Sequence, residues 1–208
     1  LKEMQALFLK EAVRNQVLPL DDRSLERVNA ALVGRPDLMA GRTTLSVFEG
    51  MVGMTENTFI NIKNRSHTIK AEVEIPPAGG DGVIICQAGR FGGWSLYLKA
   101  GRPTYTYNWL GLERFTISAT EPLPAGKTTI RFVFAYDGGK PGSGGTGTIE
   151  IDGRKVAEGR IPKTQGYIFS ADEGADVGLD AATPVTDDYK HRDNKFTGKI
   201  HRVTIELK

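Results

Sequence analysis

The clearest structural signal in the chain is Thr129-Ile130-Arg131-Phe132-Val133-Phe134-Ala135-Tyr136. Every second residue of this run is large and apolar, namely Ile130, Phe132, Phe134 and Tyr136, and Thr129, Arg131 and Val133 lie between them. Alternation with a period of two is typical of a strand whose one face is buried and whose other face meets water. The run therefore predicts an antiparallel β-protein.

The same period recurs on both sides of this run. Ile69, Ala71, Val73 and Ile75 alternate with charged residues, and the closing run 199–207 alternates in the same way. Asp152-Gly153 is a two-residue hairpin signal. From Arg42 onward, glycine and proline arrive about every 8–12 residues, which is the usual spacing of turns in a β-sandwich. We therefore predict a mostly β fold in which residues 42–208 form two antiparallel sheets packed face to face.

The first 41 residues have a different character. Leu1, Met4, Leu7, Phe8 and Ala12 recur at helical spacing, which predicts a helix over 1–17. No Ser, Thr, Asp or Asn caps its beginning, so we expect this helix to be the last part of a longer structure and the chain to be a fragment. Residues 21–41 are polar and are expected to be a connector. The predicted division is thus a helix and connector over 1–41 and a sandwich domain over 42–208.

The overall composition excludes several kinds of partner. The chain has 208 residues, and its 27 basic and 25 acidic residues are interspersed, with a formal net charge of +2. Because no basic stripe is present, we expect no nucleic-acid partner. No run approaches the ~20 consecutive apolar residues of a membrane span. With Cys86 as its only cysteine, the chain has no internal disulfide framework.

Cys86 lies in the one motif that suggests catalysis. Cys86-Gln87-Ala88-Gly89-Arg90 fits the Cys-x-Pro/Ala-x-Arg pattern of sulfatases, whose cysteine is oxidised to formylglycine at the start of a helix. Here Val83-Ile84-Ile85 precedes the cysteine and a glycine turn follows it, which predicts a strand and a buried, inert thiol. The three histidines are far apart and have no ligand spacing. We therefore predict no catalytic residue in this chain.

An aromatic cluster allows two interpretations. Tyr105, Tyr107 and Trp109 share a face by parity, on a segment predicted to pair with the one that holds Trp94 and Tyr97. Such rings could stack on sugars beside polar side chains, or they could be core residues between the sheets, and regular alternation favours the core. For the sugar-binding alternative, the candidate ligand-binding residues are Arg90, Trp94, Tyr97, Asn108 and Arg131.

An acidic stretch lies between the last two predicted strands. Asp172, Asp176 and Asp180 surround two glycines, and loops of this composition can supply the oxygen ligands that calcium requires. No EF-hand spacing is present, so solvated loop carboxylates are the alternative. Calcium is the one cofactor that the residues themselves suggest.

Several segments resemble the C-terminal end of long bacterial arylsulfatases. The resemblance covers essentially the whole chain and rests on Lys2-Glu3-Met4-Gln5-Ala6-Leu7-Phe8, Asn15-Gln16-Val17-Leu18-Pro19-Leu20-Asp21-Asp22-Arg23, Gly34-Arg35-Pro36-Asp37, Phe91-Gly92-Gly93-Trp94-Ser95, Tyr107-Asn108-Trp109-Leu110-Gly111 and Phe196-Thr197-Gly198-Lys199-Ile200. It implies a concanavalin A-like jelly roll attached to a sulfuric ester hydrolase that uses formylglycine and calcium. Those catalytic residues would belong to a preceding domain, and none is carried by a position of this chain.

Two functions follow as expectations. The first is a non-catalytic accessory domain that packs on the catalytic domain of an arylsulfatase. The alternative is a module that binds carbohydrate or sulfated glycan and brings an enzyme to its substrate. The apolar helix at the start could also join two copies of the chain. If the parent is an exported sulfatase, the resemblance implies a periplasmic or secreted protein.

Overall fold

The computed structural model describes residues 1–20, 36 and 38–208, and most of the predicted connector lies outside them. The chain divides into two compact units, Leu1–Pro36 and Asp37–Lys208, and each is described by itself. Among the described residues, no helix is both long enough and apolar enough to cross a membrane.

The first unit holds helix α1, Lys2–Arg14, within the predicted range 1–17. Leu1 occupies the N-cap position without a side-chain cap, as its residue type implies. The helix ends where Gln16 adopts a positive φ of 56° and the Val17 N–H donates a hydrogen bond to the carbonyl of Ala12. Its apolar side chains are mostly exposed: Leu1, Met4, Leu7, Phe8, Leu9 and Val13.

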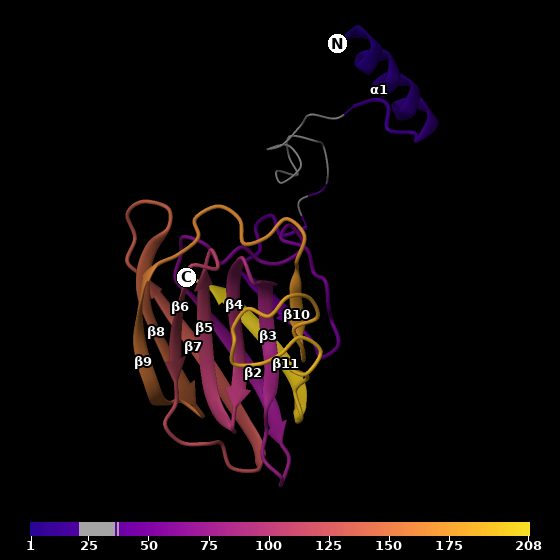
Figure 1. The fold of residues 1–208 in the computed structure, drawn as a ribbon. Coiled ribbons are helices and arrows are strands. Elements are labelled where there is room, and N and C mark those ends of the chain that lie inside the picture. Colours follow the sequence, from indigo (N-terminus) through magenta and orange to yellow (C-terminus); the bar gives the residue numbers. More distant parts are fainter. Residues whose placement is uncertain (21–35, 37) are drawn as a thin grey trace. The chain divides into compact units, whose positions relative to one another are not determined.

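The second unit is a sandwich of two sheets, as the alternation predicted (Figure 1). The six-stranded sheet has the order β1-β11-β2-β7-β8-β9, and the five-stranded sheet has the order β10-β3-β4-β5-β6. Every pair of neighbouring strands is antiparallel. The strands are β1 Thr44–Val47, β2 His67–Ile75, β3 Gly82–Gly89, β4 Gly92–Lys99, β5 Arg102–Trp109, β6 Glu113–Ser118, β7 Gly126–Tyr136, β8 Ser143–Ile151, β9 Arg154–Lys163, β10 Ala175–Val177 and β11 Lys199–Leu207.

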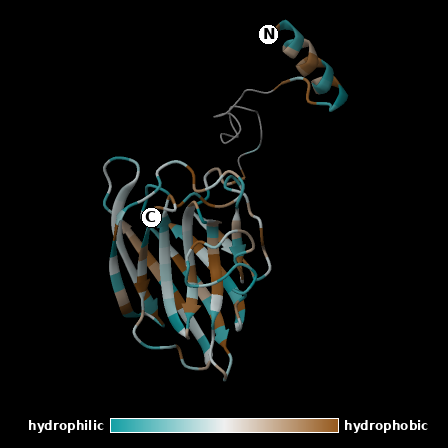
Figure 2. Ribbon diagram, in the orientation of Figure 1, coloured by the Kyte–Doolittle hydropathy of each residue, from teal (hydrophilic) through white to brown (hydrophobic). Residues whose placement is uncertain are grey.

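The main core lies between the two sheets, and the alternating residues of β2 and β7 supply much of it. Figure 2 shows the resulting alternation of hydrophobic and hydrophilic residues along the strands. Phe132 of the six-stranded sheet stacks on Tyr105 of the five-stranded sheet, with ring centroids 3.6 Å apart and planes inclined by 8°. His67 is buried beside Phe134, with ring centroids 5.3 Å apart. Aromatic contacts thus join the sheets near the middle of the sandwich.

The outer face of the six-stranded sheet carries paired charges. Arg131 lies 2.7 Å from Glu150 on the neighbouring strand, and Arg202 lies 2.9 Å from Glu72. His201 lies at a register shift between Ile200 and Arg202 and is exposed beside Glu74, whereas Val203 is buried. A β-bulge inserts one residue, and parity along the strand changes at that point.

A long segment between β10 and β11 covers the outer face of the five-stranded sheet, and Figure 1 shows it in orange and yellow beside β3 and β10. A second, smaller core forms beneath it from Val83, Cys86, Tyr97 and Val185, with Tyr189 packed against them. Residues 181–195 of this segment are mostly polar and mostly exposed or partly exposed, but Val185, Thr186 and Asn194 are buried.

Candidate functional site

Cys86 lies in the interior of β3 and is fully buried, as the strand interpretation predicted. Burial raises the pKa of its thiol well above the ordinary value, and the nearby carboxylates of Asp180 and Asp176 raise it further. A buried thiol with a raised pKa is a poor nucleophile at neutral pH. Because Cys86 lies within a strand, it also lacks the helical position of a sulfatase cysteine.

The aromatic rings proposed for sugar stacking lie inside the molecule. Trp94 has no exposed surface, and Tyr97, Tyr105 and Tyr107 are also buried, while Trp109 is partly buried against the core. Tyr97 faces the smaller core, on the opposite side of β4 from Trp94. These buried rings cannot present a face to a sugar, so the core interpretation holds for them and the ligand-binding roles of Trp94 and Tyr97 are corrected.

Two further candidate residues have structural partners. Arg131 pairs with Glu150 on the outer face of the six-stranded sheet, whereas Trp94 belongs to the five-stranded sheet. Asn108 is fully buried. Arg90 is exposed in the turn between β3 and β4. The five candidates therefore do not form one site: Arg90 is exposed, Arg131 is partly exposed but paired with Glu150, and the other three are buried.

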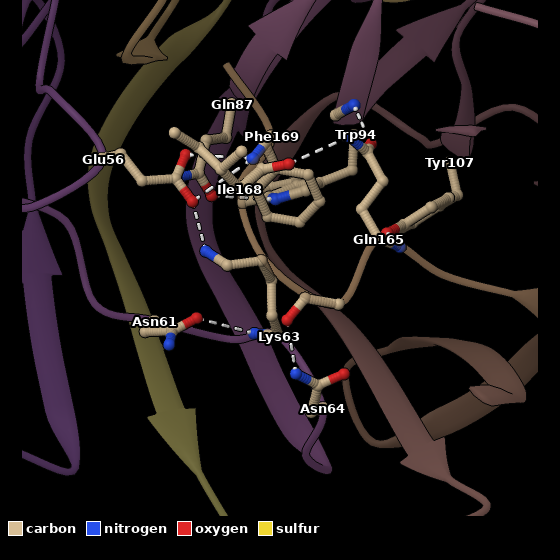
Figure 3. Close-up of polar contacts among 12 residues, drawn as sticks. Glu56, Asn61, Lys63, Asn64, Gln87, Trp94, Tyr107, Gln165, Ile168 and Phe169 are labelled. Atoms are coloured by element: carbon tan, nitrogen blue, oxygen red, sulfur yellow. Dashed lines mark hydrogen bonds and ion pairs between the residues drawn. The ribbon is translucent and has the colours of Figure 1, made fainter. Parts of the chain in front are cut away.

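The buried rings instead support one end of the sandwich, as Figure 3 shows. The Trp94 Nε1–H donates to Gln87 Oε1 over 3.1 Å. The backbone N–H of Gln165 donates to the Tyr107 hydroxyl over 2.7 Å, and the Gln165 side chain accepts from the Gly93 N–H over 3.1 Å. Residues 164–170 follow β9 and run across this end of the sandwich in Figure 1. The hydrogen bonds of Gln165 connect this segment to β4 and β5.

An ion pair of low exposure holds the same segment from a second side. Lys63 pairs with Glu56, and their side chains are 5% and 20% exposed. The Glu56 carboxylate also accepts from the backbone N–H of Phe169, and Lys63 Nζ lies 4.9 Å from the Phe169 ring centroid. Because the partners of a buried charge are costly to remove, this pair restricts where residues 164–170 can lie.

At this end of the sandwich, the β3–β4 turn, the β5–β6 turn and the segment after β9 carry exposed apolar side chains, and Arg90 lies among them. We define the rim patch as Arg90, Phe91, Leu110, Leu112 and Tyr167. Phe91, Leu112 and Tyr167 are 75%, 72% and 86% exposed. The turns that carry them are adjacent, since a Cβ added to Gly111 would lie 2.8 Å from the Arg90 carbonyl oxygen, and one added to Gly92 would lie 2.5 Å from the Gln165 side chain.

Asn108 fixes the two hairpin turns of the rim patch relative to each other. Its amide nitrogen donates to the carbonyls of Gly89 and Arg90 in the β3–β4 turn, over 2.9 and 3.0 Å. Its side-chain oxygen accepts from the Gly111 N–H in the β5–β6 turn over 2.9 Å. The same amide nitrogen also donates to the Val185 carbonyl over 3.1 Å. Asn108 therefore stabilises the backbone of both turns, and as a fully buried residue it is not accessible to a ligand.

The cations around the rim patch differ in their partners. Arg114 lies 3.4 Å from Asp187, and Lys163 pairs with Glu113 while its Nζ lies 3.8 Å from the Trp109 ring centroid. Arg90 has no side-chain hydrogen bond or ion pair to another described residue. A guanidinium without a partner keeps all five donors for an anionic group, and a carboxylate or sulfate can accept two of them at once.

Periodicity cannot identify most of this patch. Phe91, Leu110, Leu112 and Tyr167 lie in turns or in a connecting segment, where no alternation applies. The available signal is local: Phe91 precedes Gly92-Gly93, and Leu110 and Leu112 flank Gly111. Each of these large apolar residues has one glycine neighbour without a side chain to cover it, and a group of such exposed residues is typical of an interaction surface.

The acidic stretch separates into exposed and buried residues. Asp172 is exposed, whereas Asp176 in β10 and Asp180 are buried and lie with Cys86 in one group whose ligand atoms are all within 4.8 Å. Burial raises the pKa of Asp180 to about 6, although hydrogen bonds from Val185 and Tyr189 act in the opposite direction. The calcium candidates Asp176 and Asp180 are therefore together, and Asp172 is not part of that group.

Comparison with known proteins places the fold. No family model and no curated sequence matches this chain. Among solved structures, the CBM40 of a Ruminococcus gnavus IT-sialidase bound to alpha2,3 sialyllactose superposes with a TM-score of 0.52 and 10% identity, over 79% of this chain and 89% of that one. A structure of NanB with Optactamide gives a TM-score of 0.56 and 11% identity, over 78% of this chain and 26% of that one.

At such low identity, these similarities show the fold and nothing finer. The chain has a two-sheet antiparallel β-sandwich fold like that of these structures, which the alternation predicted and the arylsulfatase resemblance also implied. The arylsulfatase parent itself gains no support from the comparisons and rests on the sequence segments alone.

Proposed function

We propose that this domain is a glycan-binding module and that the rim patch is its binding surface. The observation that carries the proposal is the combination of exposed Phe91, Leu112 and Tyr167 with the unpartnered guanidinium of Arg90 on a supported end of the sandwich. Sugar rings present apolar faces and polar edges, which match flat or aliphatic side chains beside a hydrogen-bond donor.

The chemistry of Arg90 favours an acidic sugar. Its guanidinium can hold a carboxylate or sulfate group, and Tyr167 can contact the ring next to it. The fold neighbours are consistent with this type of ligand, since R. gnavus CBM40 structures contain alpha2,3 or alpha2,6 sialyllactose. We therefore expect sialylated or sulfated oligosaccharides to bind better than their neutral counterparts.

The test is a titration of the ¹⁵N-labelled domain with alpha2,3 sialyllactose, with a sulfated disaccharide and with lactose as the neutral control. We expect amide shifts confined to the turns of the rim patch. Replacing Arg90 with alanine removes a charge-assisted contact of about 1.5–3 kcal/mol, and affinity for the acidic sugars should fall by roughly ten- to a hundredfold.

Arg102→Ala is the matched control, since Arg102 is exposed at the first position of β5 in the same sheet and its loss should leave binding unchanged. Tyr167→Ala should weaken binding to every sugar that binds at all, because stacking does not depend on charge. If none of the three sugars shifts an amide of the rim patch at millimolar concentration, glycan binding at this surface is refuted.

An accessory role beside an arylsulfatase catalytic domain is the second candidate. It rests on the resemblance described above and on the exposed apolar side chains of α1, such as Met4 and Phe8. We propose that this helix packs on the catalytic domain. Deleting residues 42–208 from a full-length parent should lower its solubility or turnover, and unchanged values for both would remove this candidate.

A further inference from the structure

Cys86 and Asp176 face each other across two antiparallel strands. They are register partners between β3 and β10, and a third side chain, Asp180, follows Asp176 by one short turn of chain. All three are buried beneath the segment that covers the outer face of the five-stranded sheet. One thiol and two carboxyls are thus placed within 4.8 Å of one another by sheet register and by the fold of that segment.

The hydrogen bonds leave one atom of this group unsatisfied. Asp176 accepts from the backbone N–H of Gly53 over 2.7 Å and from that of Ala181 over 2.9 Å. Asp180 accepts through Oδ2 from the Val185 N–H and the Tyr189 hydroxyl, over 3.0 and 2.8 Å. Asp180 Oδ1 is buried and has no hydrogen-bond partner. A buried carboxylate oxygen without a partner is costly, and its position in this group indicates a missing positive partner.

The surroundings supply no such partner. Glu173 adds a third carboxylate whose charge acts on both Asp180 and Cys86. Within the described part of the chain, no lysine, arginine or histidine forms an ion pair with Asp176 or Asp180. Neighbouring buried carboxylates that lack a counter-charge require either a proton or a bound cation.

The ligand types select the class of cation. A thiolate with two carboxylate oxygens suits a thiophilic divalent ion such as Zn²⁺, whereas calcium takes oxygen ligands only. The Leu179 carbonyl oxygen accepts a hydrogen bond from the Cys86 thiol over 3.7 Å, and loss of the thiol proton would leave this oxygen available as a fourth ligand. Tetrahedral bonds of ~2.3 Å to sulfur and ~2.1 Å to oxygen would place those two ligand atoms about 3.6 Å apart.

We propose that Cys86, Asp176 and Asp180 form a structural site for a thiophilic divalent cation, with the Leu179 carbonyl as a fourth ligand. Binding deprotonates the thiol and releases that proton to solvent, and the divalent ion then offsets two of the three negative charges of its ligands. The site connects β3, β10 and the covering segment, which is the role of a structural zinc ion. The proposed site shares Asp176 and Asp180 with the calcium site expected from the sequence and has Cys86 in place of the exposed Asp172.

The first test uses the unchanged domain, refolded with Zn²⁺ because the ligands are buried, and then dialysed. X-ray absorption at the zinc edge should show one sulfur at ~2.3 Å and oxygens near ~2.0 Å. Co²⁺ loaded in the same way should give a thiolate-to-cobalt charge-transfer band that Zn²⁺ removes. A domain that retains no zinc after refolding, or a zinc shell without sulfur, would overturn the proposal.

Variants then assign the ligands. Cys86→Ala and Asp180→Asn should each lower zinc affinity at least tenfold and abolish the rise in melting temperature that Zn²⁺ gives the unchanged domain. Asp172→Asn is the matched control from the same acidic stretch and should keep both properties, since Asp172 is exposed. Equal thermal shifts in the unchanged domain and in Cys86→Ala, or a larger shift with Ca²⁺ than with Zn²⁺, would refute a thiolate site.

Discussion

His67 should make the stability of the sandwich depend strongly on pH. Its side chain is buried in the main core, where burial lowers the pKa from 6.5 to about 4, although the contact of Nδ1 with the Arg65 carbonyl acts in the opposite direction. The second ring nitrogen, Nε2, is buried without a partner. A proton on this ring therefore costs the folded state far more than the unfolded state.

The sign and size follow from linkage. Since the folded pKa of His67 is the lower one, the unfolded chain takes up the proton first as the pH falls below 6.5. The contribution of neutral His67 to the free energy of unfolding is fully present above pH 6.5 and is lost as the pH falls to about 4. Between pH 7.5 and pH 5, proton linkage with these two values removes about 2 kcal/mol from the free energy of unfolding.

The assay is urea unfolding of the domain and of His67→Phe at both pH values. Phenylalanine fits the apolar surroundings of Phe132 and Phe134, removes the unpartnered nitrogen and loses one hydrogen bond. Other titrating groups contribute equally to both proteins, so the difference between their pH effects isolates His67. We expect the fall in the free energy of unfolding between pH 7.5 and pH 5 to be about 2 kcal/mol larger in the unchanged domain than in His67→Phe. Replacing exposed His201 with glutamine is the control, and equal pH effects in the domain and in His67→Phe would refute this reasoning.

Two further substitutions test the packing at the supported end and in the six-stranded sheet. Gly145→Ala should lower the free energy of unfolding by about 1–3 kcal/mol, since its Cβ would lie 2.4 Å from the Phe134 ring and 2.5 Å from the Ala135 carbonyl oxygen; urea unfolding measures this, and an unchanged midpoint would contradict it. Trp94→Phe should lower the free energy of unfolding by about 2–4 kcal/mol, because it leaves a cavity and removes the hydrogen-bond donor of the buried Gln87 Oε1. Combining it with Gln87→Met should cost less than the sum of the two single changes, and strict additivity would show that the hydrogen bond contributes nothing.

The strands could be predicted because their physics is local. The apolar residues of β7 alternate with a strict period of two, and Asp152-Gly153 forms the hairpin turn between β8 and β9 with positive φ at both positions. His201 shows where the rule stops. One inserted residue at the bulge reverses the parity of β11, and nothing in Ile200-His201-Arg202 marks the insertion.

The candidate site was less predictable because it depends on contacts between distant segments. The types of Trp94 and Tyr97 allow sugar stacking, but burial depends on which residues cover them, and Tyr97 is covered by residues about 90 positions later, such as Asp188 and Tyr189. Similarly, the acidic stretch indicated a cation, but only the register between β3 and β10 brings Asp176 to Cys86.

The hydrogen bonds of Asn108 bear on which substitutions the rim patch can accept. Because one buried amide holds the β3–β4 and β5–β6 turns, the backbone of the rim has its shape before any ligand arrives, and binding need not order it. The exposed side chains of Phe91, Leu110 and Leu112 contribute little to that framework. Under the glycan-binding function proposed above, substitutions there would change the groups offered to a ligand while the backbone framework stays intact, so the rim patch would be a starting point for engineering specificity.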